Sequence, residues 1–250
     1  MINLVKAETK RYFIEIKTYY PDQIVDVIVK YLLFTLFFYG FTQNATSVSY
    51  IGYLYWIVAS CIISELSVNV SYEKQTGTFE QLILKPYPCW LIMIVRTYIV
   101  LLVTLAKSAA LVLVIGITLP VSFSFSLSLL PVFLVSIIGY TGLGLLLSGL
   151  TLKFTKIASF EAIISYGLLL LSGFLIPYAS MPHGIRILLS FLPFSAGIEV
   201  SQRVLANAPN GFGLQLLWLF LLNSLGFLFG LFVFRQLFRH VRKYGLLNRY

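Results

Sequence analysis

Charge is scarce in this sequence of 250 residues, of which only 11% are Asp, Glu, Lys or Arg. Soluble domains are roughly 45–50% apolar and about 25% charged, whereas 59% of this chain is hydrophobic. A soluble fold of this length could not hide so much apolar surface, because even well-packed domains leave much of their surface to water. We therefore predict an integral membrane protein whose outer face contacts lipid.

Residues that carry covalent or metal chemistry are few. The two cysteines, Cys61 and Cys89, have neither metal-type nor redox-type spacing, and we interpret both as small hydrophobic residues. The two histidines, His183 and His240, fall on opposite sides of the membrane in the topology derived below. No glycine is followed by lysine, which excludes the G-x-x-x-x-G-K-[ST] phosphate loop of an ATPase. The sequence predicts no enzyme, metal site or bound cofactor in this chain.

Acidic residues are scarcer than basic ones. The sequence has nine Asp and Glu and 18 Lys and Arg, which gives a formal net charge of +9. In a soluble protein this excess would suggest nucleic acid as a partner. Here the basic residues lie between long apolar runs, which favours contact with anionic lipid headgroups. We expect membrane lipids among the partners and no nucleic acid. The first 20 residues have no apolar core segment, so no cleavable signal is predicted.

Long apolar runs are what the sequence has in quantity. A spanning helix needs about 20 apolar residues, and six stretches qualify: residues 24–41, 50–70, 91–119, 127–150, 157–176 and 212–234. We predict an all-α membrane protein with a six-helix transmembrane domain over residues 23–235. A basic cytoplasmic tail is expected at residues 236–250.

The segment before the first span, residues 1–22, alternates apolar and charged residues at helical spacing. This pattern is typical of an amphipathic helix that lies on the membrane surface. We expect this helix to be cytoplasmic and to turn Leu4, Phe13, Ile14 and Ile16 towards lipid.

The basic residues give the orientation of the spans. Three of the 18 lie within apolar stretches (Lys30, Arg96 and Lys107). Of those in the connections between spans and in the terminal segments, two fall on one side of the membrane (Arg186 and Arg203) and 13 on the other. Lys and Arg concentrate in cytoplasmic connections. We therefore expect a multi-pass protein of the cell (inner) membrane with both termini cytoplasmic, which requires an even number of spans.

The last outer connection, residues 177–211, is longer than the others and still apolar. It is too short for two more full spans. We predict one or two short helices that re-enter the outer leaflet, where protein or water must cover their free backbone groups.

The connection after the second span predicts a short cytoplasmic helix within residues 77–86. Gly77 should end the preceding helix, and Thr78 with Gln81 matches the S/T-x-x-E/Q capping box at the start of a new one. Pro86 should stop this helix.

This predicted helix has an apolar side that suits docking into a groove of a cytoplasmic partner. Phe79, Leu82 and Ile83 would supply the anchors. The alternative is an ordinary interfacial loop helix without a partner.

Two motifs resemble those of one family of membrane proteins. The first, Glu73-x-x-x-Gly77-Thr78-x-Glu80-x-Leu82-x-x-x-Pro86, resembles the motif after the second span of ABC-2 type transporter permeases. The second is similar to the end of the fifth span and the re-entrant segment of that superfamily, including the ABCG-type exporters. It consists of Ser172-Gly173-Phe174-Leu175-Ile176-Pro177, then Pro182, then Leu192-Pro193.

The resemblance implies the ABCG-like fold and a transmembrane permease subunit of an ATP-driven exporter. Such a subunit pairs with a second permease, as a homodimer or heterodimer, and with two copies of a cytoplasmic ABC ATPase that bind ATP and Mg. It implies an amphipathic, lipid-like, drug or antibiotic substrate. The residues implied for coupling to the ATPase are Glu73, Gly77, Thr78, Phe79, Glu80, Leu82 and Ile83. The alternatives are a channel or carrier not driven by ATP, or a membrane assembly subunit.

Charges within the spans need partners, because one at a helix centre costs about 2.5–3.5 kcal/mol. Asp26 and Lys30 are four residues apart, which favours a local pair. Glu65 and Arg96 are expected at similar depth in the second and third spans, so we predict an intramembrane ion pair between them. This pair would couple the docking helix to both spans or simply neutralise the charges. Lys107 has no evident partner, and it either reaches outward or lines the pathway.

Other side chains within the spans suit packing or substrate contact. Small residues of the fourth span, among them Gly139, Gly142 and Gly149, allow close approach of another helix. On the fifth span, Tyr166 and Phe174 are further candidates for the pathway.

Overall fold

The computed structural model describes residues 1–41, 49–119, 126–154, 161–174, 182–206 and 211–243. These residues form helices and no strand. In chain order the helices are α1 (Ile2–Thr18), α2 (Tyr20–Phe41), α3 (Ser49–Gln75), α4 (Phe79–Ile83), α5 (Cys89–Thr118), α6 (Leu129–Lys153), α7 (Glu161–Leu171), α8 (His183–Ser190), α9 (Pro193–Leu205) and α10 (Phe212–Lys243).

Five of these helices, α2, α3, α5, α6 and α10, are long and apolar enough to cross a membrane. The predicted fifth span, residues 157–176, is represented by the shorter apolar helix α7. Residues 155–160 and 175–181 on either side of α7 lie outside the described residues. The predicted all-α membrane fold is confirmed.

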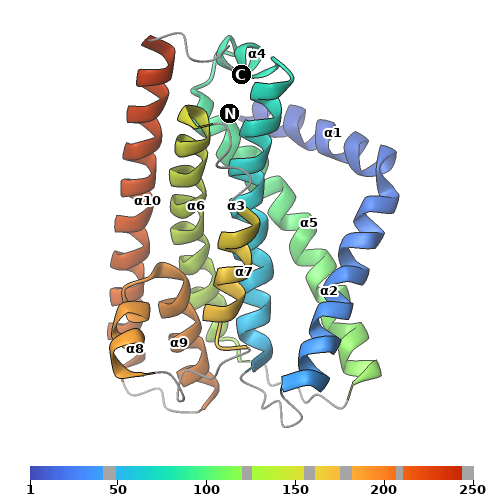
Figure 1. Cartoon of the computed structure of the whole chain (residues 1–250), viewed down its shortest axis with the longest axis vertical. Helices are drawn as coiled ribbons and strands as arrows, with labels where there is room; N and C mark the ends of the chain where they lie inside the picture. Colours follow the sequence, from blue (N-terminus) through green and yellow to red (C-terminus); the bar gives the residue numbers. More distant parts are fainter. Residues whose placement is uncertain (42–48, 120–125, 155–160, 175–181, 207–210, 244–250) are drawn as a thin grey trace.

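The centre of the bundle depends on close contact between α6 and α10, which run side by side in Figure 1. A Cβ atom added to Gly230 of α10 would lie 2.0 Å from the backbone oxygen of Gly142. A Cβ added to Gly142 would lie 2.6 Å from the backbone oxygen of Gly226. Both separations are below van der Waals contact, so only glycine allows these backbones to approach so closely. This is the packing role predicted for the small residues of the fourth span.

Helices α1 and α2 stand at one side of the bundle. In Figure 1, α1 crosses near one end of α5 and α2 descends at the edge of the molecule. Leu4, Glu8 and Tyr12, which are four residues apart, form the buried face of α1. Phe13 and Ile14 are exposed, as predicted for a face turned to lipid. The prediction for Leu4 is wrong, because this side chain packs into the protein core.

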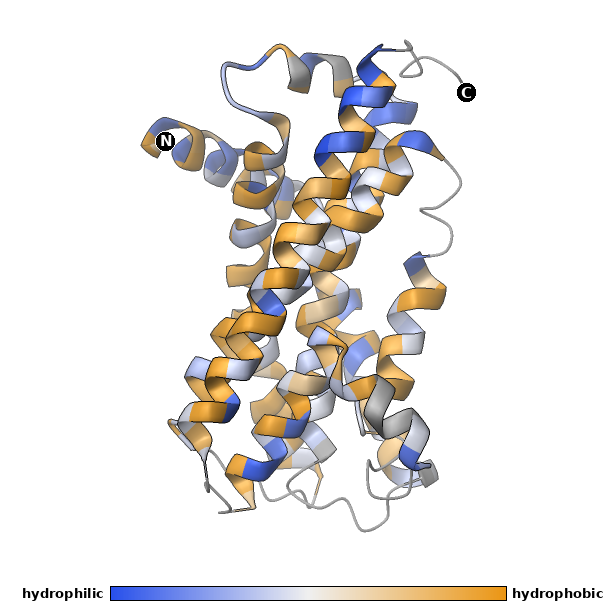
Figure 2. Ribbon diagram, turned by 90° about the vertical axis from the view of Figure 1, so that its left-hand side faces the viewer, coloured by the Kyte–Doolittle hydropathy of each residue, from blue (hydrophilic) through white to orange (hydrophobic). Residues whose placement is uncertain are grey.

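The two ends of the bundle differ. Helix α4, the start of α1 and the last turn of α10 lie at one end, and α8 and α9 lie at the other (Figure 1). Figure 2 shows apolar residues along the middle of the long helices and hydrophilic residues gathered at the end that carries α4. His183 begins α8 and His240 lies in the last turn of α10, so the two histidines are at opposite ends.

Candidate functional site

The turn between α3 and α4 is fixed by backbone geometry. Gly77 has a φ of 71°, a left-handed conformation that favours glycine and ends α3 as predicted. The carbonyl oxygen of Thr78 accepts hydrogen bonds from the backbone N–H groups of Gln81 and Leu82, at 3.1 and 3.3 Å. The hydroxyl of Thr78 donates to the carbonyl of Glu73 at 3.3 Å. The threonine side chain therefore holds the end of α3 instead of making the predicted capping box, and α4 has only five residues.

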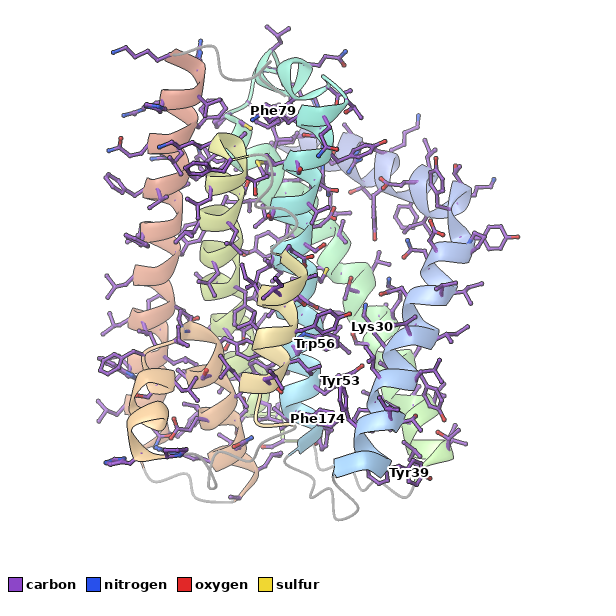
Figure 3. The ribbon with its side chains drawn as sticks, in the orientation of Figure 1. Lys30, Tyr39, Tyr53, Trp56, Phe79 and Phe174 are labelled. Atoms are coloured by element: carbon purple, nitrogen blue, oxygen red, sulfur yellow. The ribbon has the colours of Figure 1, made fainter. Side chains whose placement is uncertain are left out.

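The apolar side of α4 faces its own chain. Phe79 is 2% exposed and Leu82 is 3% exposed, and both belong to the main hydrophobic core. Figure 3 shows Phe79 beneath α4 at the end of the bundle. The prediction that Phe79 and Leu82 anchor a partner is therefore wrong, because a buried side chain offers no surface to another protein. The side chains of Glu80 and Ile83 lie outside the described residues.

A cluster of charges, buried at Glu8 and Arg96 and exposed at Arg11 and Lys85, joins the elements around α4. Arg96 on α5 donates from Nε to Oε2 of Glu8 at 3.3 Å and from Nη1 to Oε1 of Glu73 at 2.5 Å. Lys85, just after α4, donates to Oε1 of Glu8 at 3.2 Å. Arg11 completes the set through Nε, at 3.0 Å from Oε2 of Glu8. The cluster thus connects α1, the end of α3, the segment after α4 and α5.

Glu8 is the central acid of this cluster, with a side chain only 3% exposed. Burial alone would raise the pKa of the Glu8 carboxyl, because it disfavours the charged form. The positive charges of Arg96 and Lys85 and the hydrogen bond from Lys85 outweigh that effect, so the pKa of Glu8 is lowered. Glu8 is therefore an ionised carboxylate held by three basic side chains.

The predicted ion pair between Glu65 and Arg96 is wrong, since Arg96 pairs with Glu8 and Glu73 in the part of the chain that the structure describes. The reason is the depth of the two acids along α3. Glu73 lies in the last turn of this helix, level with Arg96, whereas Glu65 is eight residues earlier, about 12 Å along the helix axis at 1.5 Å per residue. Glu65 lies two turns deeper and bonds to Asn69.

Glu65 faces a polar cavity of about 360 Å³ among α1, α2, α3, α5 and the start of α7. Lys107 donates to Oδ2 of Asp26 at 2.7 Å and to Oε1 of Gln23 at 3.0 Å. The predicted pair of Asp26 with Lys30 is present, at 2.6 Å. Lys107 therefore has partners on α2 that the sequence did not indicate, and it lines this cavity.

The two aromatic candidates of the fifth span differ. Phe174 is 1% exposed and packs against Phe34 and Tyr53, with ring centroids 5.3 and 5.2 Å apart. Figure 3 shows Tyr53, Trp56 and Phe174 gathered beside α3 and α7. Within the part of the chain that the structure describes, Phe174 is thus enclosed by other aromatic rings. Tyr166 is 55% exposed and stacks on Trp56 at 6.5 Å.

The family model for the ABC-2 type transporter matches residues 2–206, which include α1, α4 and the charge cluster. The chain belongs to the ABC-2 type transporter family. As a member it is a permease subunit, the membrane component of an ABC transporter, and is not itself catalytic. No curated protein matches the chain.

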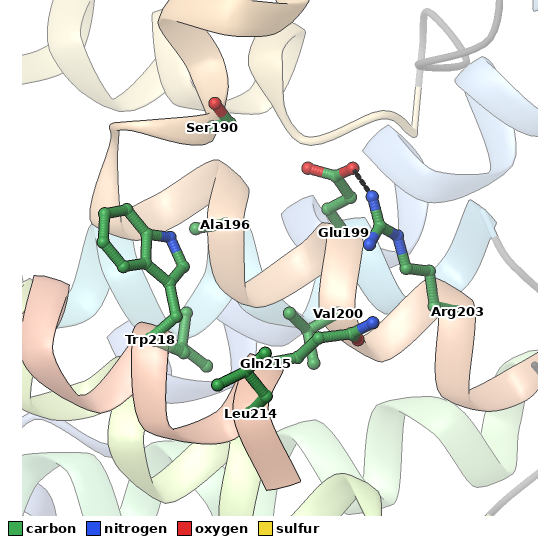
Figure 4. A pocket seen from close by; sticks show the side chains of 9 residues that line it. Ser190, Ala196, Glu199, Val200, Arg203, Leu214, Gln215 and Trp218 are labelled. Carbon is green, nitrogen blue, oxygen red and sulfur yellow. Dashed lines mark hydrogen bonds and ion pairs between the residues drawn. The ribbon is translucent and has the colours of Figure 1, made fainter. Parts of the chain in front are cut away.

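Two features of this ABC-2 permease were missed from sequence. Glu8 was not predicted as a site residue. Its place between Leu4 and Tyr12 on one face of the helix indicates a carboxylate that is buried with a basic partner, and this pattern could have been used. The second feature is a hollow of about 300 Å³ between α9 and α10 (Figure 4). It carries an ion pair of Glu199 and Arg203 at 2.6 Å. No motif in the sequence marks this hollow.

Proposed function

We propose that this ABC-2 permease works in an exporter of the cell (inner) membrane, with its termini and α4 in the cytoplasm. A second permease subunit and two copies of a separate ABC ATPase complete the transporter. The ATPase binds ATP and Mg, and the permease moves an amphipathic, lipid-like, drug or antibiotic molecule out of the cytoplasm or the inner leaflet.

The observation that carries this proposal is the charge cluster around Glu8. It connects the two segments that flank α4, the element offered to the ATPase, with α1 and the spanning helix α5. Lys85 belongs to the segment after α4, whereas Arg96 lies in the second turn of the spanning helix α5. Glu8 and Arg96 form a buried pair, and removing one partner of such a pair costs about 3–5 kcal/mol. Lys85, which is 42% exposed, joins the segment after α4 to Glu8. A displacement of α4 would therefore be passed through Lys85 and Glu8 to α1 and α5.

The surface available to the ATPase is the exposed side of α4 and of the residues next to it. Gln81 of α4 is exposed there, as are Gly77 and Thr78 before the helix and Leu84 after it, and Leu84 is 84% exposed. We assign the contact with the ATPase to this side, together with Glu80 and Ile83 from the family motif. Phe79, Leu82 and Glu73 would act indirectly, because they hold α4 to its own chain.

The polar cavity supports an amphipathic substrate. Its lining includes four carboxylates (Glu15, Asp26, Glu65 and Glu161) and two ammonium groups (Lys30 and Lys107) within a largely apolar bundle. Charged side chains at membrane depth usually serve a pathway or a partner. A molecule with a polar group and an apolar body could place the first in this cavity and the second against lipid.

The test of the ATPase contact is a matched pair of aspartate substitutions. Leu84→Asp, just after α4, should abolish ATPase association and ATP-driven efflux from vesicles that contain the purified complex. Leu214→Asp, at a residue 76% exposed at the opposite end, is the control and should leave both unchanged. The proposal fails if the permease transports at full rate without an ATPase, or if both variants behave alike.

A further inference from the structure

The end of α10 forms a cavity that the transport proposal does not use. It has a volume of about 330 Å³, and its walls include Arg235, Arg239 and Arg242 of α10 together with Tyr87 and Trp90 before and within α5. The guanidinium of Arg235 lies 4.9 Å from the ring centre of Trp90. Phe234 and Phe238, stacked at 6.0 Å, add an apolar wall.

No carboxylate among the described side chains balances the positive charge of this cavity. Among the described side chains, no carboxylate lies within ion-pair distance of Arg239 or Arg242. The segments that the structure does not describe contain no Asp or Glu, and Glu80 is the one acidic residue whose side chain lies outside the described part of the chain. Three guanidinium groups around one cavity, each with donors for oxygen, form a ready site for an anion.

The surface of α10 below the cavity indicates what kind of anion fits. Residues spaced alternately four and three positions apart lie on one face of α10 and form a stripe. The first four residues of this stripe are Leu221, Leu225, Leu228 and Phe232. These four side chains are 48–65% exposed. The same steps then reach Arg235, Arg239 and Arg242, which are also exposed. The stripe changes from apolar to cationic where the apolar part of the helix ends, as expected at a boundary between hydrocarbon and headgroups.

We propose that this cavity binds the phosphate-bearing headgroup of an anionic phospholipid, with its acyl chains along the apolar stripe of α10. Arg239 and Arg242 would hold the phosphate oxygens, while Trp90 and Tyr87 lie at the level where aromatic residues favour the membrane interface. An acidic segment of a protein would also satisfy the arginines. It would leave the adjoining apolar stripe without a role, and the continuity of the two surfaces therefore favours a lipid.

The test uses the full chain in neutral detergent, titrated with phosphatidylglycerol or phosphatidylcholine and read by native mass spectrometry. Phosphatidylglycerol should bind tighter by about fivefold or more, and Arg239→Gln with Arg242→Gln should weaken it on the order of 25-fold. The control is Lys6→Gln with Lys10→Gln, which removes the same charge from exposed positions of α1 and should leave binding unchanged. Arg239→Lys, which keeps the charge, should retain most of the affinity and shows that substitution there permits folding.

Three results would overturn the proposal. The first is equal binding of the two lipids, and the second is an equal loss in the arginine and lysine variants, which would indicate general surface charge. The third is binding of glycerophosphoglycerol, the headgroup without acyl chains, as tightly as the intact lipid. Phe232→Ser should weaken the lipid and not this headgroup. Because the readout is binding, the result is independent of any ATPase or transport.

Discussion

Removing the Arg96 side chain should destabilise this permease more than removing any exposed arginine. Arg96→Met leaves Glu8, 3% exposed, and Glu73, 16% exposed, without their shared partner. Loss of one partner of a buried pair costs about 3–5 kcal/mol. Glu8 keeps Lys85 and Arg11, at 3.2 and 3.0 Å. We therefore expect the lower end of this range, about 3 kcal/mol.

The assay is thermal and denaturant unfolding of the purified protein in one detergent, followed by intrinsic fluorescence. Arg203→Met is the matched control, because Arg203 forms an exposed pair with Glu199 at 2.6 Å. Exposed pairs contribute about 0–1 kcal/mol, so this variant should unfold close to the wild type.

A double-mutant cycle identifies the partner of Arg96. Coupling of Arg96→Met with Glu73→Gln should exceed about 1 kcal/mol, whereas coupling with Glu65→Gln should stay below about 0.5 kcal/mol. Stronger coupling to Glu65 would refute the assigned pairing and restore the pair expected from sequence. Equal losses in Arg96→Met and Arg203→Met would refute the idea that burial gives the cluster its importance.

Three further substitutions test the fold. Phe79→Ala should lower the unfolding free energy by about 3–5 kcal/mol, because the side chain is 2% exposed. The control Leu84→Ala, at a side chain 84% exposed, should change it by less than about 0.5 kcal/mol. Similar losses in both variants would place Phe79 at the surface. Gly230→Ala should lower the unfolding free energy by at least about 1–3 kcal/mol, since its Cβ would lie 2.0 Å from a backbone oxygen of α6. In the control Gly167→Ala the added Cβ meets no atom within 4 Å, so this variant should not be destabilised. For Glu8, a lowered pKa means that its ionised form stabilises the fold above the ordinary value of 4.5, and that this stability is lost as pH falls through the lowered pKa. Unfolding measured against pH should therefore show a steeper acid loss for the wild type than for Glu8→Gln, and parallel curves would contradict the role of the carboxylate.

The long helices were predictable because their apolar runs are long and their ends carry clear signals. Gly77 ends α3 at a left-handed residue, as its position in the motif indicated. The short helix α4 was predictable in place but not in orientation. Phe79 and Leu82 suit the core of their own chain as well as a groove on a partner, and only the packing around α4 decides between the two.

The partners of the buried charges were less predictable for a geometric reason. Counting residues from the ends of two spans gives their relative depth only if the helix axes are aligned and the helix ends are known. That assumption paired Arg96 with Glu65. The acid at the centre of the observed cluster, Glu8, is 88 residues away on a helix that crosses the end of the bundle. No spacing rule connects two such residues. The pair of Lys107 with Asp26, 81 residues away on α2, was unpredictable for the same reason.

The two charged regions near α4 differ in how their charge is balanced, and this difference decides what their variants should change. In the cluster, Arg96 is buried and has carboxylate partners within the chain, so its removal should appear in the unfolding free energy. In the α10 cavity, Arg239 and Arg242 face no carboxylate of the described residues, so their like charges repel one another in the isolated chain. Replacing them with neutral residues should therefore leave stability in neutral detergent unchanged or raised, and should reduce only the stabilisation gained on adding phosphatidylglycerol. A loss of stability in lipid-free detergent would mean instead that these arginines hold the fold together.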